Sequence, residues 1–287
     1  PIVEWGIREE LQHGDHSAQL LDGHMDQATT QIYVKERGVI CGVPVAKMTF
    51  EILDPDCQVK TNISEGDYCG PGDVIMEITG KAWIFSGGER LALDYLQHMS
   101  GIATNTNRYV KLVEPYGTRI ADALKGIPPI RVLQKYAVRM GGGIPHMYSR
   151  HNAIVIKDNH IKMAGSITAC VNQLRARGQH GLKIEVECES IEDVHEALAV
   201  LPDSIMFDNM ELNMLTEAVK IVGDKVWTVG TGGVNEDTVV PIAKTGVKQI
   251  AIGGLVHSVK VIDISMDIGE MKDSAKRDIR LARAAGE

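Results

Sequence analysis

A short apolar run followed by a helical segment recurs through the second half of the chain, and this repeat constrains the fold most. The last four runs begin about 21 to 24 residues apart. A strand and a helix at this spacing are typical of βα units and of a parallel sheet. The runs are Ile154–Ile156, Ile184–Val186, Ile205–Phe207, Val226–Val229 and Ile250–Ile252, and the helical segments between the later ones are Ile191–Leu201, Glu211–Val222 and Asn235–Lys244.

Five such units, with earlier candidates near Arg119–Ala121 and Pro128–Arg139, favour a closed α/β barrel of parallel strands. An open doubly wound sheet is the alternative for the same repeat. A barrel places its chemistry at the carboxyl ends of the strands. Polar residues and glycines follow the apolar runs at these ends: Lys157-Asp158, Glu185 and Glu187, Asp208-Asn209, Thr231-Gly232-Gly233 and Gly253-Gly254.

The first hundred residues follow another pattern, that of an α+β unit. Residues 32–45 alternate around a turn at Gly38, and Val74–Ile78 has the character of a further strand. From Glu89 the period changes to that of an amphipathic helix extending towards Val113. A domain boundary is therefore expected inside this helix or just after it.

Charge and composition argue against several classes of partner. The net charge is −8 with a pI near 5.7, so neither nucleic acid nor an anionic membrane is expected as a partner. No apolar run reaches membrane-spanning length, and no signal-peptide pattern opens the chain. The five cysteines contain no CxxC pair, which favours reduced, buried thiols in a cytoplasmic protein.

Two consecutive strand ends carry glycine loops, Thr231-Gly232-Gly233 and Gly253-Gly254. Glycines at a strand-to-helix turn expose backbone N–H groups, which favour anions. Barrels often bind phosphate at their last two βα loops. Ordinary turn chemistry would explain one such loop, but two in succession favour a phosphate site.

Lys125, His146 and Lys157 are candidates for a cationic lining around a phosphorylated or pyrophosphorylated substrate, because the oxygens of a leaving phosphate must be stabilised. A solvated lysine and a structural histidine are the ordinary alternatives. Glu187 and Asp208, on successive strands, are candidates for holding Mg²⁺, directly or through water, or for binding ribose hydroxyls. An ion pair with Lys157 is compatible with either role.

The stretch Ser86-Gly87-Gly88-Glu89-Arg90 has the character of a helix start. An arginine in the first turn opposes the helix dipole, so Arg90 is a candidate for a subunit interface or for anion binding, with a solvated arginine as the alternative. The sequence contains no Rossmann fingerprint, P-loop or zinc-ligand spacing.

Taken in order, these motifs resemble the quinolinate phosphoribosyltransferase family, the carboxylating nicotinate-nucleotide pyrophosphorylases, over nearly the whole chain. The resemblance implies an N-terminal α/β sandwich over residues 1–112, joined by residues 272–287, and an α/β barrel with fewer than eight regular strands over residues 113–271. The matching stretches are Gly14-Asp15, ERLALDYLQHMSGIAT (89–104), KYAVRMGGG (135–143), VIKDNHI (155–161), IEVECES (184–190), IMFDNM (205–210), TGGV (231–234) and IGGLVHS (252–258).

The resemblance also implies a reaction. A ring nitrogen attacks C1 of phosphoribosyl pyrophosphate, pyrophosphate leaves in the company of Mg²⁺, and the quinolinate adduct loses carbon dioxide. Dimers or hexamers are implied, with Arg90 reaching the neighbouring subunit's site. The implied roles are anion binding for Lys125 and Lys157, a place in the substrate pocket for His146, ribose and metal binding for Glu187 and Asp208, and a 5′-phosphate cradle for Thr231, Gly232, Gly233, Gly253 and Gly254.

The chain departs from the family pattern where the family binds the two carboxylates of quinolinate. Leu124 stands in place of an arginine in the first barrel loop, and Ile144 and Met147 stand in place of two arginines around His146. These changes remove bidentate carboxylate clamps. Each hydrogen bond to a charged group contributes about 1.5–3 kcal/mol, so quinolinate binding is expected to weaken strongly.

The sequence therefore predicts a phosphoribosyltransferase with an acceptor pocket altered towards a less anionic, more apolar nitrogen-heterocycle acid. Synthesis of nicotinate mononucleotide, a step of NAD biosynthesis, is the family default. Two alternatives stay open. One is a non-catalytic relative that binds a phosphoribosyl ligand, and the other is different barrel chemistry on a phosphosugar with Lys157 as a nucleophile.

Overall fold

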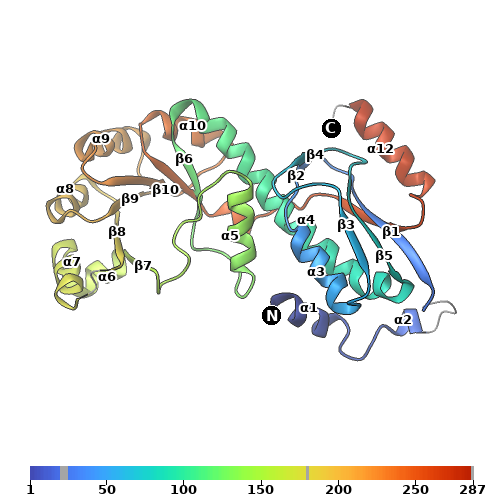
Figure 1. The fold of residues 1–287 in the computed structure, drawn as a ribbon. Helices are drawn as coiled ribbons and strands as arrows, with labels where there is room; N and C mark the ends of the chain where they lie inside the picture. The colour runs from blue at the N-terminus through green and yellow to red at the C-terminus, as the bar shows by residue number, and fades with distance from the viewer. Residues whose placement is uncertain (20–24, 179–180, 286–287) are drawn as a thin grey trace. The chain divides into compact units, whose positions relative to one another are not determined.

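The computed structural model describes residues 1–19, 25–178 and 181–285, and the chain divides into two compact units (Figure 1). The first unit contains Pro1–Asn105, Ile127–Gly141 and Ser258–Glu287, and the second contains Thr106–Gly126 and Gly142–His257. The boundaries expected from the sequence, 112/113 and 271/272, differ from this grouping. Strand β12 accounts for part of the difference, because it pairs with β1 in the first unit.

The first unit is built on a four-stranded antiparallel sheet in the order β12-β1-β5-β3. Its core combines the sheet residues Ile32 and Ile78 with Phe50 of α3 and Leu96 of α4. Figure 1 shows α3 and α4 on one side of this sheet and α12 on the other, as expected for an α/β sandwich. The elements are α1 (Ile2–Glu10), α2 (His16–Gln19), β1 (Gln27–Val34), β2 (Gly38–Val39), α3 (Val43–Leu53), β3 (Gln58–Thr61), β4 (Tyr68–Cys69), β5 (Val74–Lys81), α4 (Ala82–Val113), α5 (Arg131–Met140), β12 (Ile264–Ile268) and α12 (Asp273–Ala285).

Helix α4 begins earlier than the sequence analysis predicted. It starts at Ala82 and runs for 32 residues, so Gly87 and Gly88 lie inside it and Arg90 is not in its first turn. The argument from the helix dipole about Arg90 is therefore wrong. Gly88 is retained in the helix for close packing, because a Cβ there would lie 2.9 Å from Leu53 Cδ1 and 2.9 Å from Phe50 Cε1.

The second unit is built on a six-stranded, all-parallel sheet in the order β6-β11-β10-β9-β8-β7. Within this sheet, strands β7 to β11 follow one another in chain order, and β6, the earliest of the six in the sequence, pairs with β11, the latest. A doubly wound sheet would instead reverse its strand order across a central strand. The elements are η1 (Glu114–Tyr116), β6 (Arg119–Asp122), β7 (Ala153–Ile156), α6 (Asp158–Ala164), α7 (Ile167–Ala176), β8 (Lys183–Cys188), α8 (Ile191–Val200), β9 (Ser204–Asp208), α9 (Leu212–Val222), β10 (Trp227–Thr231), α10 (Glu236–Lys244), β11 (Gln249–Ile252) and α11 (Gly254–His257).

This cyclic order is that of an α/β barrel with fewer than eight regular strands, which confirms the predicted fold class. The barrel is less completely closed than expected. Ile144 forms a parallel bridge with Ala121 of β6, but among the described residues no strand ladder joins the segment at Ile144 to β7. Helices α7, α8, α9 and α10 lie outside the sheet in Figure 1. Inside it, Met206, Val229 and Ala251 form a small apolar cluster.

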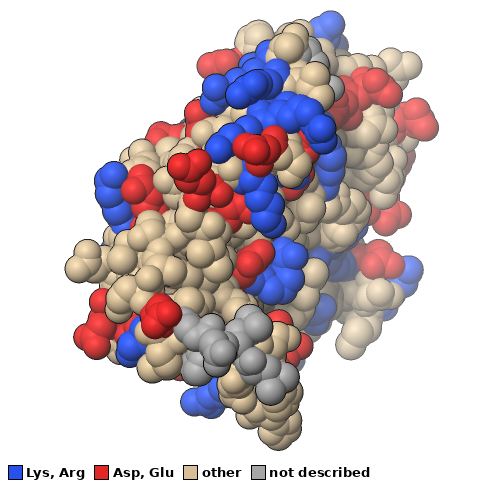
Figure 2. Space-filling model, turned by 90° about the vertical axis from the view of Figure 1, so that its right-hand side faces the viewer, with Lys and Arg blue, Asp and Glu red and all other residues tan. Residues whose placement is uncertain are grey.

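The five cysteines are all free thiols, and all but the half-buried Cys57 are buried, in agreement with the expected reduced state. No helix among the described residues is both long enough and apolar enough to cross a membrane. On the face shown in Figure 2, Lys and Arg side chains are interspersed with Asp and Glu side chains rather than gathered in one broad area.

Candidate active site

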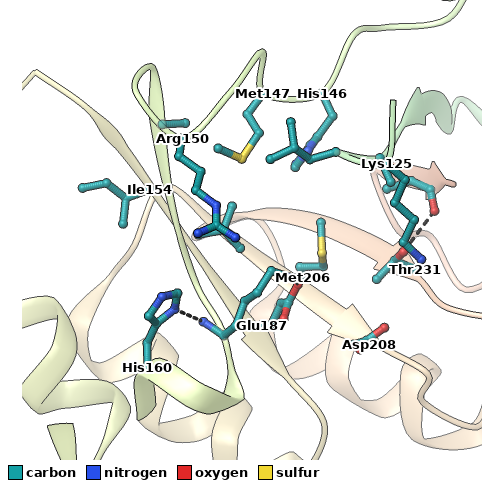
Figure 3. A pocket seen from close by; sticks show the side chains of 16 residues that line it. Lys125, His146, Met147, Arg150, Ile154, His160, Glu187, Met206, Asp208 and Thr231 are labelled. Atoms are coloured by element: carbon teal, nitrogen blue, oxygen red, sulfur yellow. Dashed lines mark hydrogen bonds and ion pairs between the residues drawn. The ribbon is translucent and has the colours of Figure 1, made fainter. Parts of the chain in front are cut away.

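A pocket of about 390 Å³ opens at the carboxyl ends of the barrel strands in the second unit (Figure 3). Its position follows from the parallel sheet, because all six strands end on the same side. The residues that line it come from the loop after β6, from the segment before β7, from strands β7 to β11 and from α6. They are Ala123, Leu124, Lys125, His146, Met147, Arg150, Ala153, Ile154, Val155, Lys157, His160, Glu187, Met206, Asp208, Thr231 and Ala251.

Lys157 and Glu187 form an ion pair across two neighbouring strand ends. Lys157 directly follows β7, and its backbone N–H donates to His160 Nδ1 at 3.1 Å, which fixes the start of α6. Burial raises the pKa of Glu187; the Lys157 ammonium opposes this rise, and Asp208 adds to it. The pair thus stands at the pocket wall with its carboxylate in a partly dry environment.

Asp208 ends β9 and faces the same pocket without a cationic partner among the described residues. Its Oδ1 accepts a hydrogen bond of 3.1 Å from Asn209 Nδ2. A backbone hydrogen bond of 3.0 Å, from Asn209 N to Thr231 O, holds the end of β10 beside Asp208. Gly232 has a φ of +91°, and a Cβ there would lie 2.7 Å from Asn209 N, so only glycine fits this turn.

Lys125 extends from the loop after β6 along the end of β11. A Cβ on Gly253 would lie 2.9 Å from Lys125 Cδ and 3.1 Å from His257 Nε2, so the missing side chain at Gly253 makes room for the lysine stem. No described carboxylate lies within ion-pair distance of the Lys125 ammonium. Figure 3 shows this side chain beside Thr231, whose Oγ1 donates to Ala251 O at 3.1 Å.

His146 lies in the pocket wall, where Asp122 and Glu185 hold it and Ser204 positions Glu185. Its backbone N–H donates to Asp122 Oδ1 at 2.8 Å, and its Nε2 lies 2.9 Å from Glu185 Oε1. Glu185 Oε2 accepts from Ser204 Oγ at 2.8 Å. Glu185 and Glu187 thus have different partners on the same face of β8. Glu185 is bonded to the histidine, and Glu187, which lines the pocket, is paired with Lys157.

The pocket is apolar on the side where the family pattern would place arginines. Leu124 and Met147, two of the three replaced positions, line it together with Ile154 and Met206, whereas Ile144, the third, lies outside the pocket lining. In Figure 3 the Met147 and Met206 side chains extend into the pocket from opposite sides. This wall offers van der Waals contact and no hydrogen-bond donor.

Arg150 is a pocket residue that the sequence analysis missed. It projects into the pocket from the segment before β7 (Figure 3). The turn that carries it is closed by two bonds: Ser149 N donates to Asn152 Oδ1 at 2.9 Å, and Asn152 N donates to Ser149 O at 3.3 Å. Its place in the sequence, between the Met147 position and the apolar run at Ile154, was the available signal.

The remaining predicted site residues lie outside the pocket lining. Gly232 and Gly233 belong to the loop after β10, next to the lining residue Thr231, and Gly254 is the first residue of α11, shortly after β11. Arg90 belongs to the first unit, where its Nε lies 3.0 Å from Asp94 Oδ1.

The carboxylates suit a magnesium ion that is held jointly with a substrate. Mg²⁺ is usually bound by one or two carboxylates together with phosphate oxygens and water. Glu187 and Asp208 supply two carboxylates on neighbouring strands, and no group of three or more metal-binding side chains occurs in residues 1–19, 25–178 and 181–285. The donor set therefore fits a substrate-borne metal better than a metal held by protein ligands alone.

Comparison with known proteins gives a consistent result over most of the chain. The models of the quinolinate phosphoribosyl transferase N-terminal and C-terminal domains match residues 15–100 and 102–267. A probable nicotinate-nucleotide pyrophosphorylase (carboxylating) of Bacillus subtilis is 36% identical over 268 residues, covering 93% of this chain and 92% of the relative. A namesake from Methanocaldococcus jannaschii is 33% identical, covering 93% of this chain and 96% of its own. The crystal structure of NadC from Streptococcus pyogenes superposes with a TM-score of 0.89 at 32% identity, covering 94% of this chain and 96% of that one.

Proposed function

The chain belongs to the quinolinate phosphoribosyl transferase family, and from this premise we propose that it transfers the phosphoribosyl group of phosphoribosyl pyrophosphate to the ring nitrogen of a small heterocyclic acid. The observation that carries the proposal is the convergence of two lysines, two carboxylates and a threonine on one pocket at the strand ends: Lys125, Lys157, Glu187, Asp208 and Thr231.

In the proposed reaction the lone pair of the ring nitrogen forms a bond to C1 of the ribose. The bond from C1 to the pyrophosphate oxygen breaks, and pyrophosphate leaves with the electron pair. The protein stabilises the charge that develops on the leaving group. Lys125 is suited to this role because no described carboxylate neutralises it, and Lys157 adds a second charge beside Glu187.

Glu187 and Asp208 would hold Mg²⁺ or the ribose hydroxyls, in keeping with their place between the two lysines. When bound, the ion would neutralise the oxygens of the diphosphate. The glycine loops 231–233 and 253–254 would receive the 5′-phosphate, because βα loops of this kind present backbone N–H groups.

The acceptor is proposed to be less anionic than quinolinate. Two charged carboxylates need cationic partners when they are desolvated. The apolar side chains of Leu124, Met147, Ile154 and Met206 offer none, and Arg150 beside them is a single cation, too few for two carboxylates. We further propose a homodimer or larger homo-oligomer in which Arg90 of a second copy completes the site. The Arg90 side chain is exposed, so it is accessible to another copy of the chain.

Thermal unfolding and pyrophosphate release test the transfer directly. With Mg²⁺ present, phosphoribosyl pyrophosphate should raise the melting temperature of the wild-type protein progressively with ligand excess. The Lys157→Met and Asp208→Asn variants should show a smaller rise and lose acceptor-dependent pyrophosphate release. Lys47→Met, on the exposed face of α3, serves as the matched control.

Binding of phosphoribosyl pyrophosphate without pyrophosphate release for any heterocyclic acid would instead indicate a non-catalytic, ligand-binding relative. Absence of any stabilisation by phosphoribosyl pyrophosphate would contradict the proposal.

A further inference from the structure

Arg150 is the feature of the pocket that neither the family pattern nor the proposed transfer explains. The turn over residues 149–152 holds it at the pocket, and its guanidinium projects among Met147, Ile154 and Met206 in Figure 3. Arg150 is exposed, so an arginine beside these apolar side chains needs a counter-charge once a bound ligand has displaced the water around it.

No such counter-charge comes from the described part of the chain. Lys157, the other cation on this side, is paired with Glu187. For Arg150, by contrast, no described carboxylate lies within ion-pair distance. The planar guanidinium fork matches a carboxylate bidentately, and the arrangement is therefore that of a receptor for an anionic group of a ligand.

The position of Arg150 separates it from the phosphoribosyl half of the pocket. Arg150 lies before the amino end of β7, whereas Lys157 follows the carboxyl end of that strand and the glycine loops follow β10 and β11, beyond β8 and β9 in the sheet. Lys125, the other unpaired cation, lies against Gly253 and so belongs to the side of β11. The anion at Arg150 is thus carried by the acceptor and not by the ribose phosphate.

Resting on the phosphoribosyl transfer proposed above, we propose that Arg150 binds the acceptor's carboxylate, and that the acceptor is a planar nitrogen heterocycle carrying one carboxylate. A single fork surrounded by methionine, leucine and isoleucine side chains accommodates one charged group and an apolar ring. The ring nitrogen attacks C1 of the ribose, pyrophosphate leaves with the electron pair of the broken C–O bond, and the carboxylate stays on the product. No carbon dioxide is released.

Calorimetry with three pyridine probes tests the inference, in the presence of ribose 5-phosphate. The probes are pyridine-3-carboxylate, the uncharged pyridine-3-carboxamide and pyridine-2,3-dicarboxylate. The wild-type protein should bind the monocarboxylate most tightly. Arg150→Gln should weaken monocarboxylate binding by about 10- to 150-fold, the range expected for a lost charged hydrogen bond, and leave carboxamide binding unchanged. Arg150→Lys should lose only part of the affinity for the monocarboxylate, because a lysine keeps the charge but not the bidentate fork.

Arg277→Gln, an exposed arginine of α12, is the matched control and should bind all three probes as the wild type does. Equal losses for carboxylate and carboxamide in Arg150→Gln, or tighter wild-type binding of the dicarboxylate, would overturn the inference. So would a wild-type protein that binds neither acid.

Separate titration with phosphoribosyl pyrophosphate distinguishes this inference from the transfer reaction. Its affinity should be unchanged in Arg150→Gln, and a fall would assign Arg150 to the phosphoribosyl half and overturn the inference. An acid site that depends on Arg150 in a protein that does not bind phosphoribosyl pyrophosphate would support the acid site and contradict the transfer.

Discussion

At the scale of single residues, the charged groups of the pocket fall into two kinds. Lys157 and Glu187 neutralise each other, whereas Lys125 and Arg150 have no described carboxylate partner. An anionic substrate meets less competition at an unpaired cation, because no protein ion pair has to be broken. The two unpaired cations therefore define where the charged ends of the substrates are expected.

Gly253→Ala is predicted to impair the site by displacing Lys125. The new Cβ would lie 2.9 Å from Lys125 Cδ. Affinity for phosphoribosyl pyrophosphate, measured by calorimetry, should fall by about tenfold, since a hydrogen bond to a charged group contributes about 1.5–3 kcal/mol. Gly181→Ala is the control, because nothing lies within 4 Å of its new Cβ. Unchanged affinity in Gly253→Ala would show that Lys125 does not bind this ligand.

Some of the site residues were predictable from the sequence and others were not. Lys157, Glu187 and Asp208 follow apolar runs directly, so the strand period alone placed them at the strand ends. Arg150 could not be placed in this way. It lies in a turn before β7, and the direction of a turn side chain depends on bonds such as Ser149 N to Asn152 Oδ1, which leave no periodic signal.

At the scale of elements, helix α4 shows how packing overrides a local signal. Two adjacent glycines predicted a helix start near residue 87, because glycine disfavours helix interiors. In the structure the helix continues through them, since Gly88 lies against Phe50 and Leu53 of α3. Single-sequence reasoning could not anticipate this contact, because it joins segments far apart in the chain.

The two glycines of α4 should respond differently to alanine. In Gly88→Ala the new Cβ meets the buried Phe50 ring, so the free energy of unfolding should fall by about 1–3 kcal/mol, the usual cost of overpacking. In Gly87→Ala the nearest atom is the end of the Leu11 side chain at 3.2 Å, and higher helix propensity should offset the contact. Urea unfolding of both variants is the measurement, and equal stability would refute the packing argument.

His98 of α4 and Gln134 of α5 should make stability depend on pH. The ring nitrogen Nε2 of His98 lies 3.2 Å from Gln134 Nε2, and burial lowers the pKa of His98 below its ordinary value near 6.5. Between the folded and unfolded pKa values the unfolded chain binds more protons. Stability therefore falls as pH drops from above 6.5 towards the folded value, by less than about 1.4 kcal/mol per pH unit for a half-buried ring.

Urea unfolding of the wild type and of His98→Gln at pH 8 and pH 5.5 measures this effect. The variant should lose part of the acid destabilisation seen in the wild type. The same pH dependence in both proteins would mean that His98 does not contribute, and that other groups cause the change.

At the scale of the whole molecule, the order of the parallel strands gives the barrel, and the barrel places the pocket at the carboxyl ends of its strands. The spacing of the apolar runs predicted parallel βα units, and the pairing of β6 with β11 closes them into the barrel order. The missing strand pairing between β7 and the segment at Ile144 was not predictable, because that segment forms one bridge to β6 without becoming a regular strand. It is also the segment that carries His146, Met147 and Arg150.

The family membership and the apolar wall together lead to the central claim, a phosphoribosyltransferase with an acceptor other than quinolinate. The most direct test is the steady-state rate of pyrophosphate release from phosphoribosyl pyrophosphate with quinolinate and with pyridine-3-carboxylate, followed together with carbon dioxide. The account predicts release with the monocarboxylate, no accompanying carbon dioxide, and a much lower kcat/KM for quinolinate. Efficient turnover of quinolinate with one carbon dioxide per pyrophosphate would contradict it.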